Sequence, residues 1–381
     1  MKYLPLIWAG LWRKRTRTVF TLLSVMTAFL LFGMLQGVNS AFTQSVRSAN
    51  INRLYVASKF SMIEPLPLAM LQRIEQVPGV TGATYGVWFG GYYRERKNFL
   101  LSYPVDVRRY FDMFPEMQIS KETLETLATT RTGAVIGVEL AKKYDWKVGD
   151  EITIPSGIWT KADGSREWTF DIVGIFNDTG DSSRSNSLFF NYAYFDEART
   201  ITPGTVAWFI VRIADPAQSV KIAEAIDATF ANSPQETQTQ NEKEYAQAYF
   251  KQFGDINLIV SAIIGAVFFA LLFLTGNAMM QSVRERIPEI AIMKTLGLSD
   301  LGVVGLLTAE ALILCLGAAA IGMTLAYFMF GLIKSMVYAA GMPGDVILMG
   351  FGCATILAIV TILPPAWRAK QLSIVDGLRK R

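Results

Sequence analysis

The sequence predicts a membrane protein with four transmembrane α-helices and a large α+β extracytoplasmic domain inserted between helices 1 and 2. Of the 381 residues, 51% are hydrophobic and only 18% are charged, whereas soluble proteins are about one quarter charged. Four apolar runs each have the roughly 20 residues needed to cross a hydrocarbon layer of about 30 Å. The first two runs are separated by residues 39–255, whose composition is that of a water-soluble domain.

The four apolar runs are expected to be helical, because lipid offers no hydrogen-bond partner to an unpaired backbone group. Glu310 is the one charged residue within them, and the last run ends before Pro364 and Pro365. Three glycines in the third run predict close helix packing: Gly317, Gly322 and Gly331. The runs are residues 18–38, 256–280, 301–333 and 346–363.

Two other arrangements are compatible with parts of this pattern. The first run is also compatible with a cleaved signal peptide, since a basic stretch precedes it and the small residues Ser40 and Ala41 follow. It is longer than the usual apolar region of about 7–15 residues, which argues against cleavage. The runs are also compatible with buried helices of a soluble protein, but their length and near-total lack of charge favour the membrane.

Positively charged residues predict the orientation, because short basic flanks resist translocation. The connection at 334–345 holds Lys334 alone, so it is expected outside together with residues 39–255. Residues 39–255 carry 22 Lys and Arg against 26 Asp and Glu, which leaves the rest of the chain with a net charge of +8. This division favours an anionic membrane surface as partner, with no nucleic acid. The basic segments expected in the cytoplasm are 1–17, 281–300 and 364–381.

Within residues 39–255, strands are expected to alternate with short helices. Asp163-Gly164 predicts a hairpin turn between Ile158-Trp159 and residues 168–170. The polar segment 177–187 predicts an exposed loop. Strands are predicted at 51–57, 80–89, 99–103, 151–154, 168–175 and 206–213, and helices at 67–76, 120–128, 139–144 and 216–231.

Two subdomains are expected in this interval, because the pieces near its two ends belong together while residues 92–198 read as an insertion. Residues 242–253 have helical character. We expect this helix to continue directly into the second span, which would transmit motion between the membrane and the exterior.

Several classes of chemistry are excluded by residues that the sequence lacks. It has no histidine, which removes imidazole bases, ligands and pH switches. Its two cysteines, Cys315 and Cys353, lie in apolar runs and predict neither a disulfide nor a zinc site. It has no GxxxxGK[ST] phosphate loop. We therefore expect no enzyme activity of its own and no directly bound cofactor or metal, with any ATP hydrolysis supplied by a partner.

Glu310 is a candidate functional residue, because a carboxylate within an apolar helix is costly. One interpretation is a boundary glutamate bonded to a neighbouring helix or to Arg284 or Arg286. It predicts that Glu310→Gln preserves turnover and assembly. The other interpretation is a role in proton movement or substrate contact.

The segment 281–300 predicts a short helix with two apolar faces. Pro288 suits its start and Gly297 its end. Ile287, Ile290 and Ala291 lie on one side, and Ile292, Met293 and Leu296 on another. Such a helix fits between the membrane and a docked partner, and an interfacial helix without a partner is an equal alternative. The charged residues around it are Arg284, Glu285, Arg286, Glu289 and Lys294.

These residues resemble a known family. Arg284 to Gly297 is similar to the "RxxEIGxLKAxG" signature of the FtsX/MacB-type ABC permeases. Residues 306–322 resemble the third span of that family, and Pro364 to Arg379 its closing "PAxRAxxxxPxxALR" segment. Ala291 stands where the family usually has glycine, and Ser373-Ile374 where it often has proline. Exterior residues 134–141, 148–150 and 170–175 match the family's external domain.

The resemblance implies a permease of the mechanotransmission class. Two four-span subunits, either two copies or a copy and a sister permease, would work with two separate ABC ATPase subunits that bind ATP and Mg²⁺. No solute would pass between the helices, and the external domains would be moved instead. The coupling helix would be 281–298, contacting the ATPase through Arg284, Glu285, Arg286, Pro288, Glu289, Ile290, Lys294, Leu296 and Gly297. Charge reversal at Glu289 together with Lys294 is then expected to uncouple ATP hydrolysis from transport.

The expected location is a bacterial inner membrane, with both termini cytoplasmic. One branch of the family works with a periplasmic adaptor and an outer-membrane duct to expel drugs, peptides or siderophores. Another branch releases lipoproteins to a carrier. A third interpretation is a permease that activates a cell-wall hydrolase without transport. The sequence does not decide between these three.

Overall fold

The computed structural model describes residues 4–47, 52–61, 63–179, 184–251, 255–337 and 342–371. The chain divides into two compact units. The helical unit consists of Met1–Ala41 and Gly254–Arg381, and the sheet unit consists of Phe42–Phe253. Each unit is described by itself below.

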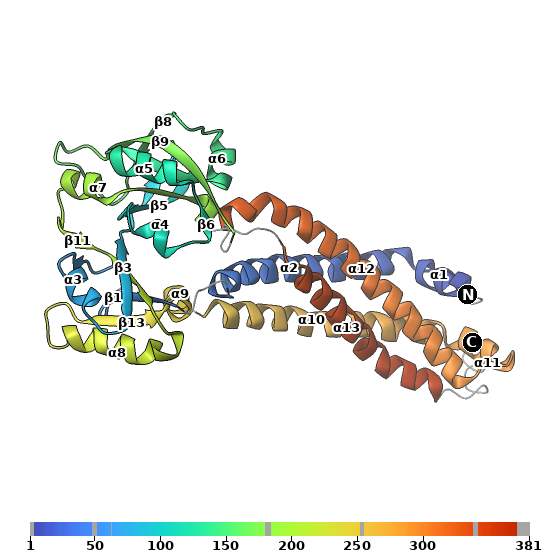
Figure 1. Ribbon diagram of the computed structural model, residues 1–381. Coiled ribbons are helices and arrows are strands. Elements are labelled where there is room, and N and C mark those ends of the chain that lie inside the picture. Colours follow the sequence, from blue (N-terminus) through green and yellow to red (C-terminus); the bar gives the residue numbers. More distant parts are fainter. Residues whose placement is uncertain are drawn as a thin grey trace. The chain divides into compact units, whose positions relative to one another are not determined.

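The helical unit confirms the four predicted spans, since four of its helices are long and apolar enough to cross a membrane (Figure 1). Their candidate spans are Arg15–Ser40, Asn257–Glu285, Asp300–Leu332 and Gly344–Lys370. The helices of the unit are α1 (Leu4–Trp12), α2 (Arg15–Arg47), α10 (Ile256–Glu285), α11 (Ile287–Thr295), α12 (Asp300–Val337) and α13 (Gly344–Lys370).

Helix packing in this unit depends on one of the three glycines singled out above. A Cβ added at Gly322 would lie 2.4 Å from the carbonyl oxygen of Met26, so this glycine lets α12 approach α2 closely. Gly317 and Gly331 have open space where a Cβ would be. Within this chain these two glycines do not bring helices close together, because glycine spacing does not say which helix face meets a neighbour.

The fourth span does not end at its two prolines. Helix α13 continues through Pro364 and Pro365 to Lys370. Proline removes one backbone hydrogen bond and favours a helix end. Ala366 and Ala369 are nevertheless buried in the apolar core of the unit, and this packing outweighs the local preference.

The sheet unit is built on one eleven-stranded sheet, and two further short strands pair with each other. The strand order is β13-β1-β12-β3-β5-β10-β7-β9-β6, with β4 on β5 and β8 on β9. The strands are β1 (Arg53–Ser58), β2 (Leu66–Pro67), β3 (Val80–Gly86), β4 (Gly91–Tyr92), β5 (Phe99–Val105), β6 (Met117–Gln118), β7 (Gly133–Gly137), β8 (Glu151–Pro155), β9 (Glu167–Asp178), β10 (Ser187–Asn191), β11 (Thr205–Val206), β12 (Trp208–Ile213) and β13 (Thr237–Asn241).

Helices cover this sheet and connect its strands (Figure 1). The longest are α8, which follows the 3₁₀ turn η2, and α9, the last element before the second span. The helices are α3 (Met70–Glu75), α4 (Tyr110–Met113), α5 (Lys121–Thr129), α6 (Val138–Tyr144), α7 (Tyr192–Ala198), α8 (Ser219–Phe230) and α9 (Glu242–Lys251), with 3₁₀ turns η1 (Arg184–Asn186) and η2 (Pro216–Gln218).

The sheet has two halves that meet between β3 and β5. The first half-sheet is β13-β1-β12-β3, and the second half-sheet is β5-β10-β7-β9-β6. The ladder between β3 and β5 has a single residue pair, Gly86 with Val105. Two further backbone bonds continue it, from Val87 N to Pro104 O (3.1 Å) and from Phe89 N to Ser102 O (3.0 Å). Backbone pairing across this joint is therefore short.

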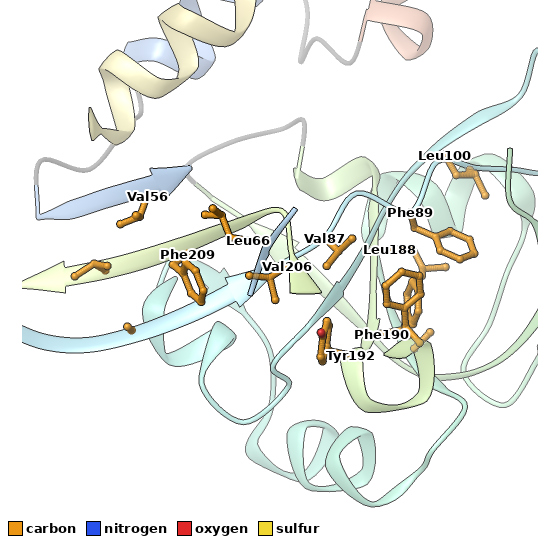
Figure 2. Close-up of a cluster of buried hydrophobic side chains, with 14 of the residues drawn as sticks. Val56, Leu66, Val87, Phe89, Leu100, Leu188, Phe190, Tyr192, Val206 and Phe209 are labelled. Atoms are coloured by element: carbon orange, nitrogen blue, oxygen red, sulfur yellow. The ribbon is translucent and has the colours of Figure 1, made fainter. Parts of the chain in front are cut away.

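Apolar side chains from both half-sheets form one continuous core (Figure 2). Val56 and Phe209 come from the first half-sheet, and Leu188 and Phe190 from the second. Phe89 packs edge-to-face on Phe190 with ring centroids 5.1 Å apart. The two half-sheets thus share apolar contacts beyond their short backbone joint.

Two predictions for the strands and loops of this unit are wrong in part. Ile158-Trp159 is not a strand, because β9 pairs instead with β8 around a longer loop that contains the predicted turn. The segment 177–187 is not wholly exposed: Asp178, Ser185 and Ser187 are buried, while residues 180–183 lie outside the described residues. The alternating burial along β9 continues inward to Asp178.

The predicted helix at 242–253 corresponds to α9, which ends at Lys251. Helix α10 has an N-cap of its own, because the side chain of Asp255 accepts a hydrogen bond from Leu258 N at 3.0 Å. The structure therefore does not have the predicted single helix from the sheet unit into the second span. The N-cap satisfies a backbone donor at a new helix start.

Candidate coupling site

The segment 281–300 folds as the end of α10, the short helix α11 and the start of α12. Residues Gln281 to Glu285 extend α10 instead of joining the short helix. Pro288 lies in the first turn of α11, where its missing N–H is not needed. Gly297 follows the helix with a φ of +95°, a left-handed conformation that favours glycine.

The two faces of α11 differ sharply in burial. Ile290 and Ala291 are 1% and 0% exposed and belong to the apolar core of the helical unit. On the other face, Ile292 is 49% exposed and Leu296 is 83% exposed. This division agrees with the predicted faces except at Met293, which was predicted to lie with Ile292 and Leu296 but is partly buried against the core. The helix thus has one face fixed in the bundle and one apolar face without cover among the described residues.

Acidic residues of the segment pair with basic residues that precede the first span. Glu285 accepts from Lys14 Nζ at 2.8 Å and from Arg17 Nη1 at 2.9 Å. Glu289 pairs with Arg13. These ion pairs are partly exposed, so each contributes little to stability by itself. Together they connect the N-terminal basic segment to both ends of the turn between α10 and α11.

Arg286 and Glu310 form a buried ion pair. Arg286 Nη1 donates to Glu310 Oε2 at 2.6 Å, and both side chains are 6% exposed. A Cβ at Gly10 of α1 would lie 2.9 Å from Arg286 Nη1, so the glycine leaves room for the guanidinium. A cavity of about 20 Å³ beside the pair is lined by Thr21 and Ser282, which is the space of about one water molecule.

The interpretation of Glu310 as a boundary glutamate predicts a bond to a neighbouring helix or to Arg284 or Arg286. The structure has such a bond, with Arg286 as the partner. The pair joins the start of α11 to the interior of α12. Because an unpaired charge in a dry bundle is very costly, the two elements are held in one arrangement. Whether Glu310 has a further role in proton movement stays a prediction.

Lys294 is also turned toward the chain itself. Its side chain is 7% exposed, and its Nζ lies 2.9 Å from Asp300 Oδ1 and 3.1 Å from the carbonyl oxygen of Lys370. It therefore connects α11 to the start of α12 and the end of α13. Among the nine residues predicted to contact an ATPase, Arg286, Ile290 and Lys294 thus contact the bundle, whereas Arg284, Pro288, Leu296 and Gly297 are exposed.

Sequence reasoning missed the part played by the N-terminal basic segment. Arg13, Lys14 and Arg17 were used only to orient the first span. The segments 13–17 and 285–289 carry charges of opposite sign, and this pattern could have predicted that they pair. Over the described residues, no group of three or more Cys, Asp or Glu side chains is arranged to hold a metal ion.

Two family models match the chain, one mostly over the sheet unit and one within the helical unit. Residues 21–229 match the family model of the MacB-like periplasmic core domain. Residues 260–374 match that of the FtsX-like permease C-terminal region. The sheet-rich domain between the first and second apolar helices is therefore a MacB-like periplasmic core domain.

Curated relatives share little sequence identity with this chain, and they align with different shares of it. The pyoverdine export ATP-binding/permease protein PvdT of Pseudomonas fluorescens (strain Pf0-1) is 22% identical over 400 residues, covering 97% of this chain and 58% of that protein. The macrolide export ATP-binding/permease protein MacB of Acinetobacter baylyi is 28% identical over 190 residues, covering 48% of this chain and 28% of that protein. The chain thus spans less than two thirds of the length of either relative.

Among solved structures, the periplasmic region of MacB from Actinobacillus actinomycetemcomitans aligns with a TM-score of 0.38 and 13% identity, covering 54% of this chain and 95% of that one. The match to the periplasmic core domain model alone extends over more than half of the chain. The chain belongs to the FtsX/MacB-type family of ABC transporter permeases.

Proposed function

We propose that this chain is the permease subunit of an ABC transporter complex, in which it couples ATP hydrolysis by a partner ATPase to motion of the sheet unit on the outer side of the membrane. The observation that carries this proposal is the uneven burial of α11. Its exposed apolar face, with Leu296 83% exposed, is suited to docking a protein, since exposed apolar patches mark interaction sites. ATP and Mg²⁺ are bound by the ATPase.

The buried face of the same helix supports transmission of a push from the ATPase. Arg286 and Lys294 connect α11 to α12 through ion pairs of 2.6 Å and 2.9 Å. Close-packed interiors respond to displacement as connected bodies and do not deform freely. A displacement of α11 therefore moves the ends of the spans that it contacts. The charge of Glu289 lies on the same helix as the docking face.

Export is the transport direction that we propose. Two relatives are named as exporters, of pyoverdine and of macrolides. These names support export over the lipoprotein-releasing and hydrolase-activating alternatives. A second permease copy or sister permease, a periplasmic adaptor and the lipid bilayer complete the proposed set of partners.

The proposed location is a bacterial inner membrane with cytoplasmic termini. The basic residues around Arg13 and Arg284 support this orientation through the preference of Lys and Arg for the cytoplasmic side. Trp8 and Trp12 of α1 are 62% and 42% exposed, with ring centroids 5.8 Å apart. Tryptophan is enriched at membrane interfaces, so α1 is suited to lie along the inner surface.

The experiment that tests this function is purification of the tagged chain in detergent from its native host, with identification of any ATPase that accompanies it. We expect the ATPase activity of that partner to rise when it is reconstituted with the chain. The double variant Ile292→Ala/Leu296→Ala is expected to lower the amount of co-purified ATPase about ten-fold, as for interface anchors.

A matched control is Leu348→Ala, which removes an equally exposed leucine (77%) from α13. It is expected to leave the amount of co-purified ATPase unchanged. Equal amounts of ATPase with the wild-type chain and the double variant would exclude this face of α11 as the docking surface.

A further inference from the structure

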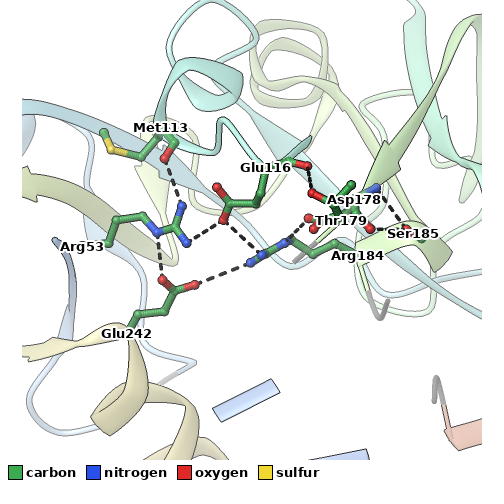
Figure 3. Close-up of polar contacts among 8 residues, drawn as sticks. All are labelled: Arg53, Met113, Glu116, Asp178, Thr179, Arg184, Ser185 and Glu242. Carbon is green, nitrogen blue, oxygen red and sulfur yellow. Dashed lines mark hydrogen bonds and ion pairs between the residues drawn. The ribbon is translucent and has the colours of Figure 1, made fainter. Parts of the chain in front are cut away.

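Four charged side chains form a closed ring in the sheet unit (Figure 3). Arg53 donates from Nη2 to Glu116 Oε1 at 2.6 Å and from Nε to Glu242 Oε2 at 2.8 Å. Arg184 donates from Nη2 to the same oxygen of Glu116 at 3.2 Å and from Nη1 to Glu242 Oε1 at 3.5 Å. Positive and negative charges alternate around this ring, which we call the charge ring.

The charge ring is shielded from water. Arg53 is 2% exposed, and the other three side chains are between 10% and 18% exposed. The guanidinium of Arg53 lies 4.4 Å from the centroid of the Phe114 ring and also donates to Met113 O at 3.1 Å. Charges removed from water to this degree are tolerated only when each is paired and hydrogen-bonded. The charge ring satisfies this condition for all four members.

The members of the charge ring come from both half-sheets. Arg53 begins β1 and Glu242 follows β13, so both belong to the first half-sheet. Glu116 precedes β6 and Arg184 lies in η1 before β10, so both belong to the second half-sheet. The contacts from Arg53 to Glu116 and from Arg184 to Glu242 therefore cross the joint, whereas the other two contacts stay within one half-sheet.

The chain enters and leaves the sheet unit next to the charge ring. Arg53 is six residues beyond Arg47, the last residue of α2, and Glu242 is the first residue of α9, which precedes α10. Both connections to the spans thus reach the first half-sheet. No span is connected directly in sequence to the second half-sheet.

Few backbone hydrogen bonds connect the half-sheets at the joint. The ladder there is a single residue pair, continued by two backbone hydrogen bonds. The first of the two chain crossings, from β3 to β5, contains Gly86, Gly90 and Gly91, with Gly90 at a φ of +67°. Apolar packing across the joint is non-directional, so it does not by itself specify one relative orientation of the half-sheets. Hydrogen-bonded charges have a fixed geometry, so the charge ring selects one arrangement of the half-sheets.

We propose that the charge ring locks the two half-sheets into one body, so that displacement arriving from the spans at β1 and α9 reaches the second half-sheet. The locking is a property of the chain alone. The transmission of displacement rests on the proposed function. Glu116 is the key positioning residue, because one of its oxygens accepts from both arginines.

The test is pulsed electron paramagnetic resonance on the full chain in detergent, with spin labels at Lys221→Cys in α8 and Lys143→Cys in α6 and with Cys315 and Cys353 replaced by alanine. Both lysines are exposed, and their helices lie on the first and second half-sheets respectively. We expect Glu116→Gln to widen the distance distribution about two-fold, because it removes the negative charge that both arginines share. The remaining charged contact across the joint, from Arg184 to Glu242, is long at 3.5 Å.

Two further variants separate locking from a general loss of charge. Glu197→Gln is the matched control, since it makes the same substitution in the exposed pair with Arg131 (62% and 67% exposed) of the second half-sheet. Asp178→Asn removes a contact to Arg184 of 2.6 Å that lies within the second half-sheet. Both are expected to keep the narrow distribution of the wild type.

An unchanged width in Glu116→Gln, or an equal widening in Glu116→Gln and Asp178→Asn, would overturn the proposal. If Glu116→Gln does not fold, as judged by near-ultraviolet circular dichroism, Arg53→Lys takes its place. This variant keeps the charge but not the two-pronged donor, and it is expected to widen the distribution to a smaller extent. No ATPase is present in this measurement. A negative result therefore does not affect the proposed function, and a failure of the proposed function does not affect the locking of the half-sheets by the charge ring.

Discussion

Buried charge is organised differently in the two units of the chain. In the helical unit, Arg286 and Glu310 face each other across 2.6 Å with side chains that are 6% exposed. In the sheet unit, each member of the charge ring has two partners of opposite sign within the ring, and Arg184 also pairs with Asp178. Removing one member of the pair leaves its partner without its main counter-charge, whereas removing one member of the charge ring leaves every remaining charge with an opposite partner. The main physical difference is therefore that the charge ring gives each charge more than one counter-charge, whereas the pair of Arg286 and Glu310 does not.

The largest effect is expected for Arg286→Met. It leaves Glu310 uncompensated in a nearly dry bundle, so the free energy of unfolding is expected to fall by about 3–5 kcal/mol. Chemical denaturation in detergent measures this change, with hydrogen exchange of peptides from α11 and α12 as the readout. The double variant Arg286→Met/Glu310→Leu is expected to recover a large part of the loss, because it removes both buried charges.

The conservative variant at the same pair sharpens the interpretation of Glu310. Glu310→Gln keeps an oxygen that accepts from Arg286, so assembly and ATP turnover of the reconstituted complex are expected to persist. A selective loss of transport with normal assembly would instead assign Glu310 a role in proton movement or substrate contact. If Arg286→Met/Glu310→Leu lost as much stability as the single variants Arg286→Met and Glu310→Leu added together, the pair would have no interaction energy of its own.

A smaller effect is expected for Arg53→Met in the charge ring. The variant loses three hydrogen bonds and the contact with Phe114, but Arg184 still faces both glutamates. We expect a loss of about 2–3 kcal/mol in the free energy of unfolding of the sheet unit, measured by thermal unfolding of the intact chain. A loss larger than that of Arg286→Met would contradict the role assigned to redundancy.

The two clusters also differ in how far the sequence predicts them. Glu310 interrupts an apolar run, so its functional interest and a pairing with Arg286 were both predictable from local sequence. Arg53, Glu116 and Glu242 stand in ordinary polar segments, up to 189 positions apart. Nothing local distinguishes them from surface charges, because their burial is produced by the meeting of two half-sheets.

The same distinction holds for the secondary structure. The four apolar runs and the alternating strand β9 were predicted, because their hydrophobic period is visible in the sequence. Strand β13 was missed, since Thr237–Asn241 (TQTQN) has no apolar residue and is held by its pairing with β1. Strand β10 was missed because the polar segment before it reads as a loop up to Ser187. Tertiary pairing, which the local pattern does not contain, defines both strands.

Acid pH is expected to weaken the charge ring moderately. Burial raises the pKa of Glu116, but the hydrogen bond from Arg53, a backbone hydrogen bond and the charges of both arginines together lower this pKa below its usual value. A carboxylate whose pKa is lowered by folding stabilises the protein above its unfolded pKa of about 4.3. That stability is lost as the pH falls through the lower pKa of the folded state.

Thermal unfolding of the intact chain between pH 8 and pH 3 measures this dependence. The contribution of Glu116 is expected to be constant above about pH 5 and to decrease below about pH 4. The difference in stability between the wild type and Glu116→Gln should therefore shrink at the acid end. A difference that grows on acidification would mean that Glu116 is bound as the neutral acid.

The smallest effect is expected for Glu197→Gln, and it tests whether burial or distance decides the strength of an ion pair. Arg131 Nη2 lies 2.7 Å from Glu197 Oε2, nearly the separation of Arg53 and Glu116, yet its two side chains are 67% and 62% exposed. Water screens exposed charges, and holding two long side chains together costs entropy. We expect a change within about 0.5 kcal/mol in the free energy of unfolding, measured by the same thermal unfolding. A loss as large as that of Arg53→Met would show that proximity alone sets the strength of ion pairs in this fold.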